Sequence, residues 1–188
     1  LFIVSSQAKG LTQNLLKTIA SDRQSEVVFQ NVEVPSSALL GEKNTGWSTI
    51  EKVLQWGAIG KCAEMSGGGQ EVLDMTVEYA KQRTQFGRPI GTFQAIQHHC
   101  ANMATDVEGA KFITYQAAWK LSEGLPAERE VAMAKAWVSE AYRRVCALGH
   151  QSHGAIGFTK EHNMQLYSRR AKAAELAFGD ADLHLEKV

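Results

Sequence analysis

The sequence has few cysteines and no excess of charge of either sign. Its 188 residues include only three cysteines, 20 basic side chains and 20 acidic side chains. The cysteines, Cys62, Cys100 and Cys146, are widely spaced and form no CxxC motif, which argues against a disulfide framework and predicts reduced thiols in a cytoplasmic protein. The balanced charge argues against a nucleic-acid partner or an anionic membrane partner, both of which require a basic surface.

Long apolar runs are also absent. No stretch approaches the roughly 18 residues that span a bilayer, so we expect no membrane span. The apolar N-terminus, Leu1–Val4, has no basic segment before it, which argues against a signal peptide. Because the chain starts without methionine and inside a strand-like pattern, we expect it to be a fragment or a processed product.

Residues 1–45 are predicted to be a short remnant of a β-domain. Leu1–Val4 reads as a strand, and Ser25–Pro35 alternates apolar and polar residues with the period of a second strand. Pro35 ends that strand because proline cannot donate to a β-ladder. Two strands alone are only marginally stable in water. We therefore expect this region to depend on sheet that the sequence does not contain.

Residues 46–188 are predicted to form an antiparallel four-helix bundle, so the fold class is mainly α. The first helix starts near Thr45 or Ser48 and runs to about Gln82, and Gly67–Gly69 either breaks it or admits a closely packed backbone. The other helices are expected at about 94–121, 127–149 and 160–178, with a loop at 151–157. Short connections between long amphipathic helices favour antiparallel packing.

The second predicted helix carries the clearest pattern. Its apolar residues recur at alternating spacings of four and three, which is one continuous stripe for a bundle interior. The stripe consists of Ile96, Cys100, Met103, Val107, Ala110, Thr114, Ala117 and Leu121.

Six histidines raise the question of a metal site, but their spacing does not support one. His98 and His99 are adjacent and diverge on a helix, and His150 and His153 have no third ligand nearby in the sequence. We interpret them as capping or surface residues. Phosphate-binding and nucleophile motifs are absent, and Gly67–Gly69 lacks the spacing of a dinucleotide-binding loop.

The segment from Tyr79 to Ile90 is the most informative. An arginine at a helix end, followed by an aromatic residue, a glycine and a proline, places a fixed cation beside a tight turn. That arrangement suits bidentate binding of a phosphate. It is also typical of a charged last turn favoured by the helix dipole, which is the more common origin of such a pattern. The residue pattern alone leaves both interpretations open.

The same segment, Tyr-Ala-Lys-x-Arg-x-Gln-Phe-Gly-x-Pro-Ile, resembles the acyl-CoA dehydrogenase family. The likeness continues through Phe93–Gln97 and covers nearly the whole chain. Further matching segments are Val27–Pro35, which resembles the last strand of the family's central β-domain, Asn102–Glu108, Ala132–Ala136, His153–Lys160 and Tyr167–Lys172. The resemblance implies the C-terminal half of such an enzyme.

The resemblance implies a cofactor, a reaction and partners. The family binds FAD and oxidises the Cα–Cβ bond of an acyl-CoA thioester, usually passing electrons to an electron-transferring flavoprotein. It implies a homo- or hetero-tetramer built as a dimer of dimers, with FAD sites shared between subunits. The implied FAD contacts are Arg83 at the pyrophosphate of a neighbouring subunit's site, Phe86, Gln94, Gln151, Ser152, His153, Gly154, Ala155, Asp180 and Asp182, and Gly179 is implied at the substrate.

The position of the family's catalytic base departs from the family pattern. The usual glutamate position is Phe178 here, and the less common position is about Gly57. Glu175, three residues before Phe178, is one candidate base. Alternatively, the chain is a non-catalytic subunit whose sister subunit supplies the glutamate, or the scaffold serves another acyl-CoA reaction. Phe178 retains the backbone N–H that in the family polarises the thioester carbonyl.

Overall fold

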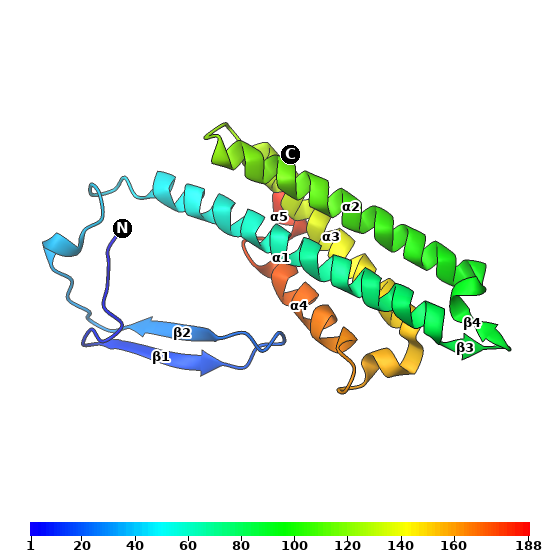
Figure 1. Ribbon diagram of the computed structural model, residues 1–188. Coiled ribbons are helices and arrows are strands. Elements are labelled where there is room, and N and C mark those ends of the chain that lie inside the picture. Colours follow the sequence, from blue (N-terminus) through cyan, green and yellow to red (C-terminus); the bar gives the residue numbers. More distant parts are fainter. The chain divides into compact units, whose positions relative to one another are not determined.

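The computed structural model describes all 188 residues and divides into two compact units, 1–54 and 55–188. A two-stranded hairpin lies in the first unit, and the second is helical apart from one short hairpin (Figure 1). The predicted fold class, mainly α with a small β-segment, is confirmed. No helix combines the length and the apolar character needed to cross a bilayer.

The first unit contains strands β1 (Leu11–Leu16) and β2 (Gln24–Phe29), which pair antiparallel with Leu11 opposite Phe29. The predicted second strand is present but ends at Phe29. The strand predicted at Leu1–Val4 is wrong, because only an isolated bridge from Phe2 to Leu39 forms there. β1 was missed because Thr12–Asn14 interrupts any apolar alternation. A 3-10 turn, η1 (Ser36–Ala38), follows β2.

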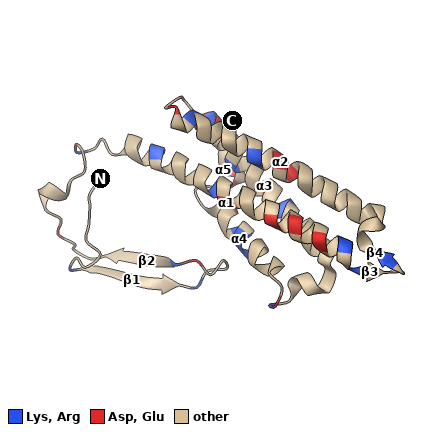
Figure 2. Cartoon of the chain, viewed as in Figure 1, with Lys and Arg blue, Asp and Glu red and all other residues tan.

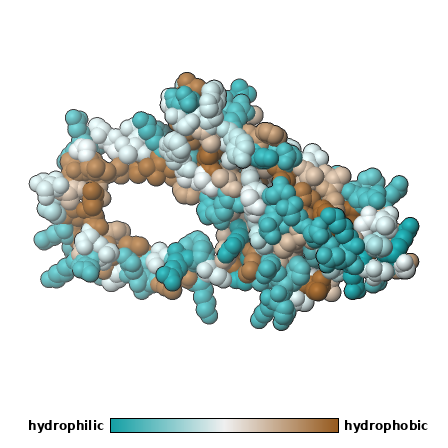
Figure 3. Space-filling view, viewed as in Figure 1, coloured by the Kyte–Doolittle hydropathy of each residue, from teal (hydrophilic) through white to brown (hydrophobic).

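Helix α1 (Trp47–Gln82) runs without interruption through the three glycines. A Cβ at Gly68 would lie 2.4 Å from the Tyr142 hydroxyl oxygen, so glycine there admits a tyrosine side chain from another helix. The predicted break is therefore wrong. The alternative of close packing is correct in kind, although a side chain rather than a backbone makes the approach. Figure 3 shows apolar surface along the first turns of α1, where Trp47 and Val53 are exposed.

A short hairpin joins α1 to the next helix. It consists of β3 (Thr84–Gln85) and β4 (Arg88–Pro89), followed by the 3-10 turn η2 (Ile90–Thr92). Helix α2 (Gln94–Ser122) then buries the middle of the predicted stripe, from Met103 to Ala117, which confirms the pattern.

The remaining helices differ from prediction at their ends. Helix α3 (Glu128–His153) runs four residues beyond its predicted end at Gly149 and stops before Gly154, whose φ of 65° ends the helix. The turn η3 (Gly154–Phe158) leads to α4 (Met164–Leu176) and then α5 (Ala181–Leu185). α5 was missed because five residues are too few to show a period.

The core of the second unit is shared by α1, α2, α3 and α4. Successive long helices run antiparallel, as their short connections require (Figure 1). Fully buried core residues include Cys62 and Val72 on α1, Met103 on α2, Val138 on α3 and Met164 on α4. The predicted site residues lie at two places on this bundle, the end that carries β3 and β4 and the turn between α4 and α5.

Candidate functional site

Most of the predicted cofactor residues gather at one end of the bundle, which we call the β3–β4 end. It is formed by residues 79–99 and 148–162. The Tyr79 ring stacks on the His153 ring with centroids 4.5 Å apart, which joins the end of α1 to the end of α3. His99 Nδ1 lies 3.4 Å from Ser152 Oγ, which joins the start of α2 to the same place.

Arg83 has a fixed backbone and a free side chain at the β3–β4 end. Its N–H donates to Tyr79 O, and its carbonyl accepts from Ile90 N–H, each at 2.8 Å. The guanidinium is exposed and makes no ion pair within the chain. Arg88 lies over the Phe93 ring at 4.2 Å. Figure 2 shows basic residues at this end, whereas acidic residues follow one another along the second half of α1.

Phe86 has an uncommon conformation and almost no cover. Phe86 and Gly87 both have positive φ, at 53° and 79°, which is the pattern of a two-residue type I′ hairpin. A bulky side chain rarely adopts this backbone conformation and is strained in it. The ring is 93% exposed and makes only an edge contact with Phe93, with centroids 6.0 Å apart. Such a ring is available to a flat ligand.

The residues from Gln151 to Ala155 divide into buried and exposed groups. Ser152 and His153 are buried, and both side chains are bonded within α3: Ser152 Oγ donates to Leu148 O at 2.8 Å, and His153 Nδ1 lies 2.8 Å from Gly149 O. Gln151, Gly154 and Ala155 are exposed, as is Gln94 at the start of α2. The accessible groups here are therefore two carboxamides and the backbone around Gly154.

The other predicted site residues lie at the turn between α4 and α5. Phe178 and Gly179 have φ values of 60° and 96°. Asp180 Oδ1 accepts from Leu183 N–H at 3.0 Å and caps α5, and Asp182 is exposed. Phe178 packs on Gly57, which precedes Arg83 by roughly 39 Å of helix at 1.5 Å per residue. One chain therefore does not bring the α4–α5 turn to its own Arg83.

The two positions where the resemblance places a base face each other. A Cβ at Gly57 would lie 2.3 Å from Phe178 Cε1, so the ring occupies the space that a side chain at position 57 would need. Neither residue offers a proton acceptor. The sequence identified both departures separately, but their contact across 120 residues required the structure.

This contact predicts a change of sign in a double-mutant cycle. Gly57→Ala alone is expected to destabilise the protein by about 1 kcal/mol or more, because the new methyl group collides with the Phe178 ring. In a Phe178→Ala background the same change should stabilise by up to ~1 kcal/mol, since alanine favours the helix interior. Urea unfolding of the four proteins measures both values, and equal effects in the two backgrounds would contradict the contact.

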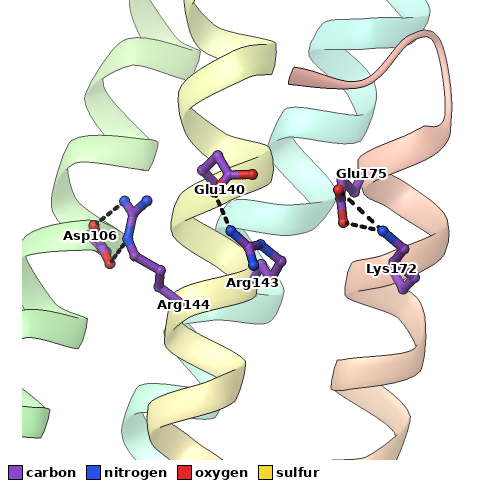
Figure 4. A network of polar contacts seen from close by, with 6 residues as sticks. All are labelled: Asp106, Glu140, Arg143, Arg144, Lys172 and Glu175. Atoms are coloured by element: carbon purple, nitrogen blue, oxygen red, sulfur yellow. Dashed lines mark hydrogen bonds and ion pairs between the residues drawn. The ribbon is translucent and has the colours of Figure 1, made fainter. Parts of the chain in front are cut away.

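Glu175 lies in a groove between α3 and α4. Its carboxylate pairs with Lys172 Nζ at 3.2 Å (Figure 4). The Glu175 side chain is 14% exposed. The groove has a volume of about 230 Å³ and is also lined by Cys146 and Ser168. Glu175 makes no contact with Gly57 or Phe178 among its polar interactions. Its role as the base stays a prediction.

Sequence reasoning missed Lys135 and His184, which hold the α4–α5 turn. Lys135 is fully buried, and its Nζ donates to Glu175 O and Gly179 O, each at 2.8 Å, and to Ser139 Oγ at 3.1 Å. Burial lowers the pKa of Lys135, and nearby Cys62 and Glu175 partly oppose that change. His184 Nε2 donates to Phe178 O at 2.9 Å. The only sequence signal was a lysine between alanines on the apolar face of α3.

Three histidines form a cluster beside η3. His153 lies 4.8 Å from the His162 ring between centroids, and His150 stacks on Phe158 at 4.4 Å and bonds to Ser168 Oγ. Burial lowers the pKa of both His150 and His153, and the nearby His162 lowers each further. The folded protein therefore favours the neutral imidazoles.

We predict that this cluster makes stability depend on pH. Because the folded state holds fewer protons than the unfolded chain near pH 6.5, stability is full above that value and falls as pH drops below it, by up to about 1.4 kcal/mol per pH unit for each proton. The Tm measured from pH 8 to pH 5 should show this fall, and His153→Gln should reduce it. His98→Gln is the matched control at an exposed position, and an identical slope in both variants would contradict the prediction.

The comparisons with known proteins agree on one family. Residues 44–188 match the family model described as acyl-CoA dehydrogenase, C-terminal domain. The 3-(aryl)acrylate reductase of Clostridium sporogenes is 36% identical over 186 residues, which is 97% of this chain and 49% of that protein. The CarC subunit of the caffeyl-CoA reductase–Etf complex of Acetobacterium woodii is 36% identical over 159 residues, 85% of this chain and 42% of that protein.

Solved structures give the same result. Butyryl-CoA dehydrogenase from Megasphaera elsdenii superposes with a TM-score of 0.94 at 32% identity, covering 98% of this chain and 49% of that one. The ChsE4–ChsE5 complex from Mycobacterium tuberculosis gives a TM-score of 0.90 at 30% identity, covering 99% and 50%. The chain therefore spans about half the length of the relatives it matches.

Proposed function

Because the chain belongs to the acyl-CoA dehydrogenase family, we propose that it forms the C-terminal portion of a flavin-dependent enzyme that oxidises the Cα–Cβ bond of an acyl-CoA thioester. The observation that carries this proposal is the β3–β4 end. There the exposed Arg83 guanidinium and the uncovered Phe86 ring lie three residues apart in the sequence, inside the motif that resembles the family's FAD contact.

The exposed groups fit FAD chemically. Arg83 offers a planar fork for the pyrophosphate, and the Phe86 ring offers a face for the adenine. Gln94, Gln151 and the backbone around Gly154 offer hydrogen-bonding groups for the remaining polar atoms. When bound, FAD supplies the acceptor for the hydride from Cβ.

Four of the proposed cofactor contacts take a narrower role. Ser152 and His153 would position the backbone around Gly154, because their side chains are already bonded within α3. Asp180 and Asp182 would suit hydroxyl groups rather than phosphates, since carboxylates accept hydrogen bonds and repel anions. The β3–β4 end and the α4–α5 turn would then serve one cofactor only from two subunits.

At the reacting carbon, the chain would contribute the α4–α5 turn. Phe178 N–H has no hydrogen-bond partner within the chain, so it is free to donate to a thioester carbonyl. That bond would acidify the α-proton by stabilising the developing oxyanion. Gly179 would allow the acyl group to approach the backbone. Glu175 is the carboxylate that this chain would offer as the acceptor of the α-proton.

A second candidate is a non-catalytic subunit of a heteromeric acyl-CoA dehydrogenase. The packing of Phe178 on Gly57 favours it, because both base positions lack a carboxylate and one ring fills the space between them. The likeness to one chain of the ChsE4–ChsE5 complex is consistent with a two-subunit arrangement. In that case this chain would supply Arg83 and its neighbours, and a sister subunit would supply the glutamate.

We also propose an electron-transferring flavoprotein as the redox partner and a tetramer as the assembly. The CarC relative belongs to a complex that is named for such a flavoprotein. Exposed apolar side chains on α2, namely Phe112, Tyr115 and Trp119, suit burial against another subunit.

Purification of the full-length protein with its flavin tests these proposals. If it is the enzyme, added acyl-CoA should bleach the visible flavin absorbance of the protein alone. If it is the non-catalytic subunit, bleaching should require a copurifying sister subunit. A flavin-free protein, alone and with any copurifying subunit, would contradict both.

A further inference from the structure

The α4–α5 turn is fixed from inside the bundle by two buried donors. Lys135 on α3 bonds the carbonyls of Glu175 and Gly179, and His184 on α5 bonds the carbonyl of Phe178 between them. Three carbonyls within five residues are therefore held by side chains from two other elements. We call Lys135 and His184 the carbonyl clamp.

Burying the Lys135 ammonium costs free energy, and hydrogen bonds must offset that cost. A fully buried ammonium loses its hydration, and it is tolerated here because all three of its N–H groups have acceptors, the third being Ser139 Oγ. Its bonds tie the last turn of α4 to the residue before the α5 cap. Between these two points the chain must turn sharply through Phe178 and Gly179.

The clamp also explains the conformation of Phe178. A non-glycine residue at a φ of 60° persists only where its surroundings over-determine it. Bonds to the carbonyls on both sides and to its own carbonyl do so here. They leave Phe178 N–H as the group of this residue that has no partner in the chain. That N–H belongs to the Ala177–Phe178 peptide, which lies between the peptides whose carbonyls the clamp holds.

We propose that Lys135 and His184 are positioning residues that aim the Phe178 N–H at the thioester carbonyl of a bound acyl-CoA. This inference rests on the proposed function, because it assigns a thioester to the free N–H. The residues touch no substrate and act only through the turn. A preformed donor costs no reorganisation when charge develops on the carbonyl oxygen. Its hydrogen bond depends on geometry, so a small error in the direction of the N–H weakens that bond strongly.

Infrared spectroscopy of the full-length, flavin-loaded protein tests the proposal. The probe is an enoyl-CoA product whose thioester carbonyl carries ¹³C, because it binds without further oxidation. In the wild-type protein the labelled stretch should move to lower frequency than in water. Lys135→Met should lose at least half of that shift and bind the probe about tenfold more weakly, with the affinity for CoA alone unchanged.

Ser139→Ala is the matched control. It removes one bond of Lys135 but leaves both turn carbonyls bonded, so it should keep the wild-type shift. His184→Leu removes the second donor and answers the question if Lys135→Met fails to fold. A wild-type shift in a folded Lys135→Met or His184→Leu variant would overturn the proposal. If the wild-type protein itself binds the probe without a shift, the proposed function fails first, and the inference fails with it.

Discussion

Phe178→Glu in the full-length protein is expected to raise the rate at which acyl-CoA reduces the flavin by roughly 10²- to 10⁴-fold, the range typical of a positioned general base. The ring of Phe178 now lies against Gly57, which has no side chain. A glutamate there would extend into the same space, at the position where the family resemblance places a base. Partial burial would raise the pKa of a new carboxyl group toward the working pH of a base.

Two control variants separate chemistry from shape. Phe178→Gln has the same size as the glutamate variant and cannot take a proton, so it should show no gain. Glu175→Gln in the wild-type background tests the competing base, and it should abolish activity only if Glu175 takes the proton. Stopped-flow measurement of flavin bleaching gives all three rates. Equal rates for the glutamate and glutamine variants would contradict the assignment of position 178.

Arg83→Ala is expected to weaken FAD binding by roughly 30- to 5,000-fold. The loss of a desolvated arginine–phosphate contact costs about 2–5 kcal/mol, and each 1.4 kcal/mol is tenfold in affinity. Arg83 can meet this expectation because its guanidinium makes no ion pair in the chain while its backbone is fixed at both its N–H and its carbonyl. The flavin content per subunit after dialysis measures the effect.

Arg88→Ala is the matched control for charge. Arg88 lies on the same short hairpin, but its guanidinium is placed over the Phe93 ring. If the general positive field at the β3–β4 end held the cofactor, both variants would lose flavin equally. We expect Arg88→Ala to retain most of it, and an equal loss would contradict a specific role for Arg83.

The sequence could predict the long elements because their signal is repeated many times. The stripe on α2 places Met103, Val107 and Ala117 on one face, and the structure buries all three. β1 was missed because Thr12–Asn14 interrupts its apolar alternation, and α5 was missed because its five residues depend on the Asp180 cap rather than on a period. The ends of α3 and α4 shifted because Gly154 and the turn at Phe178 decide them locally.

The candidate site was predictable only where residues next to each other in sequence carry it. Arg83 and Phe86 lie in one motif, and the resemblance implies a cofactor contact for both. The Phe178–Gly57 contact and the carbonyl clamp join α1, α3, α4 and α5 over long sequence distances. Lys135 was missed because its task depends on backbone carbonyls, which a sequence does not distinguish.

The most direct test is a structure of the flavin-loaded, full-length assembly. The account predicts that Arg83 of one protomer lies at hydrogen-bond distance, about 3 Å, from the pyrophosphate of a flavin whose isoalloxazine ring sits beside the α4–α5 turn of another subunit. An Arg83 side chain directed into solvent, with the flavin fully bound, would contradict it.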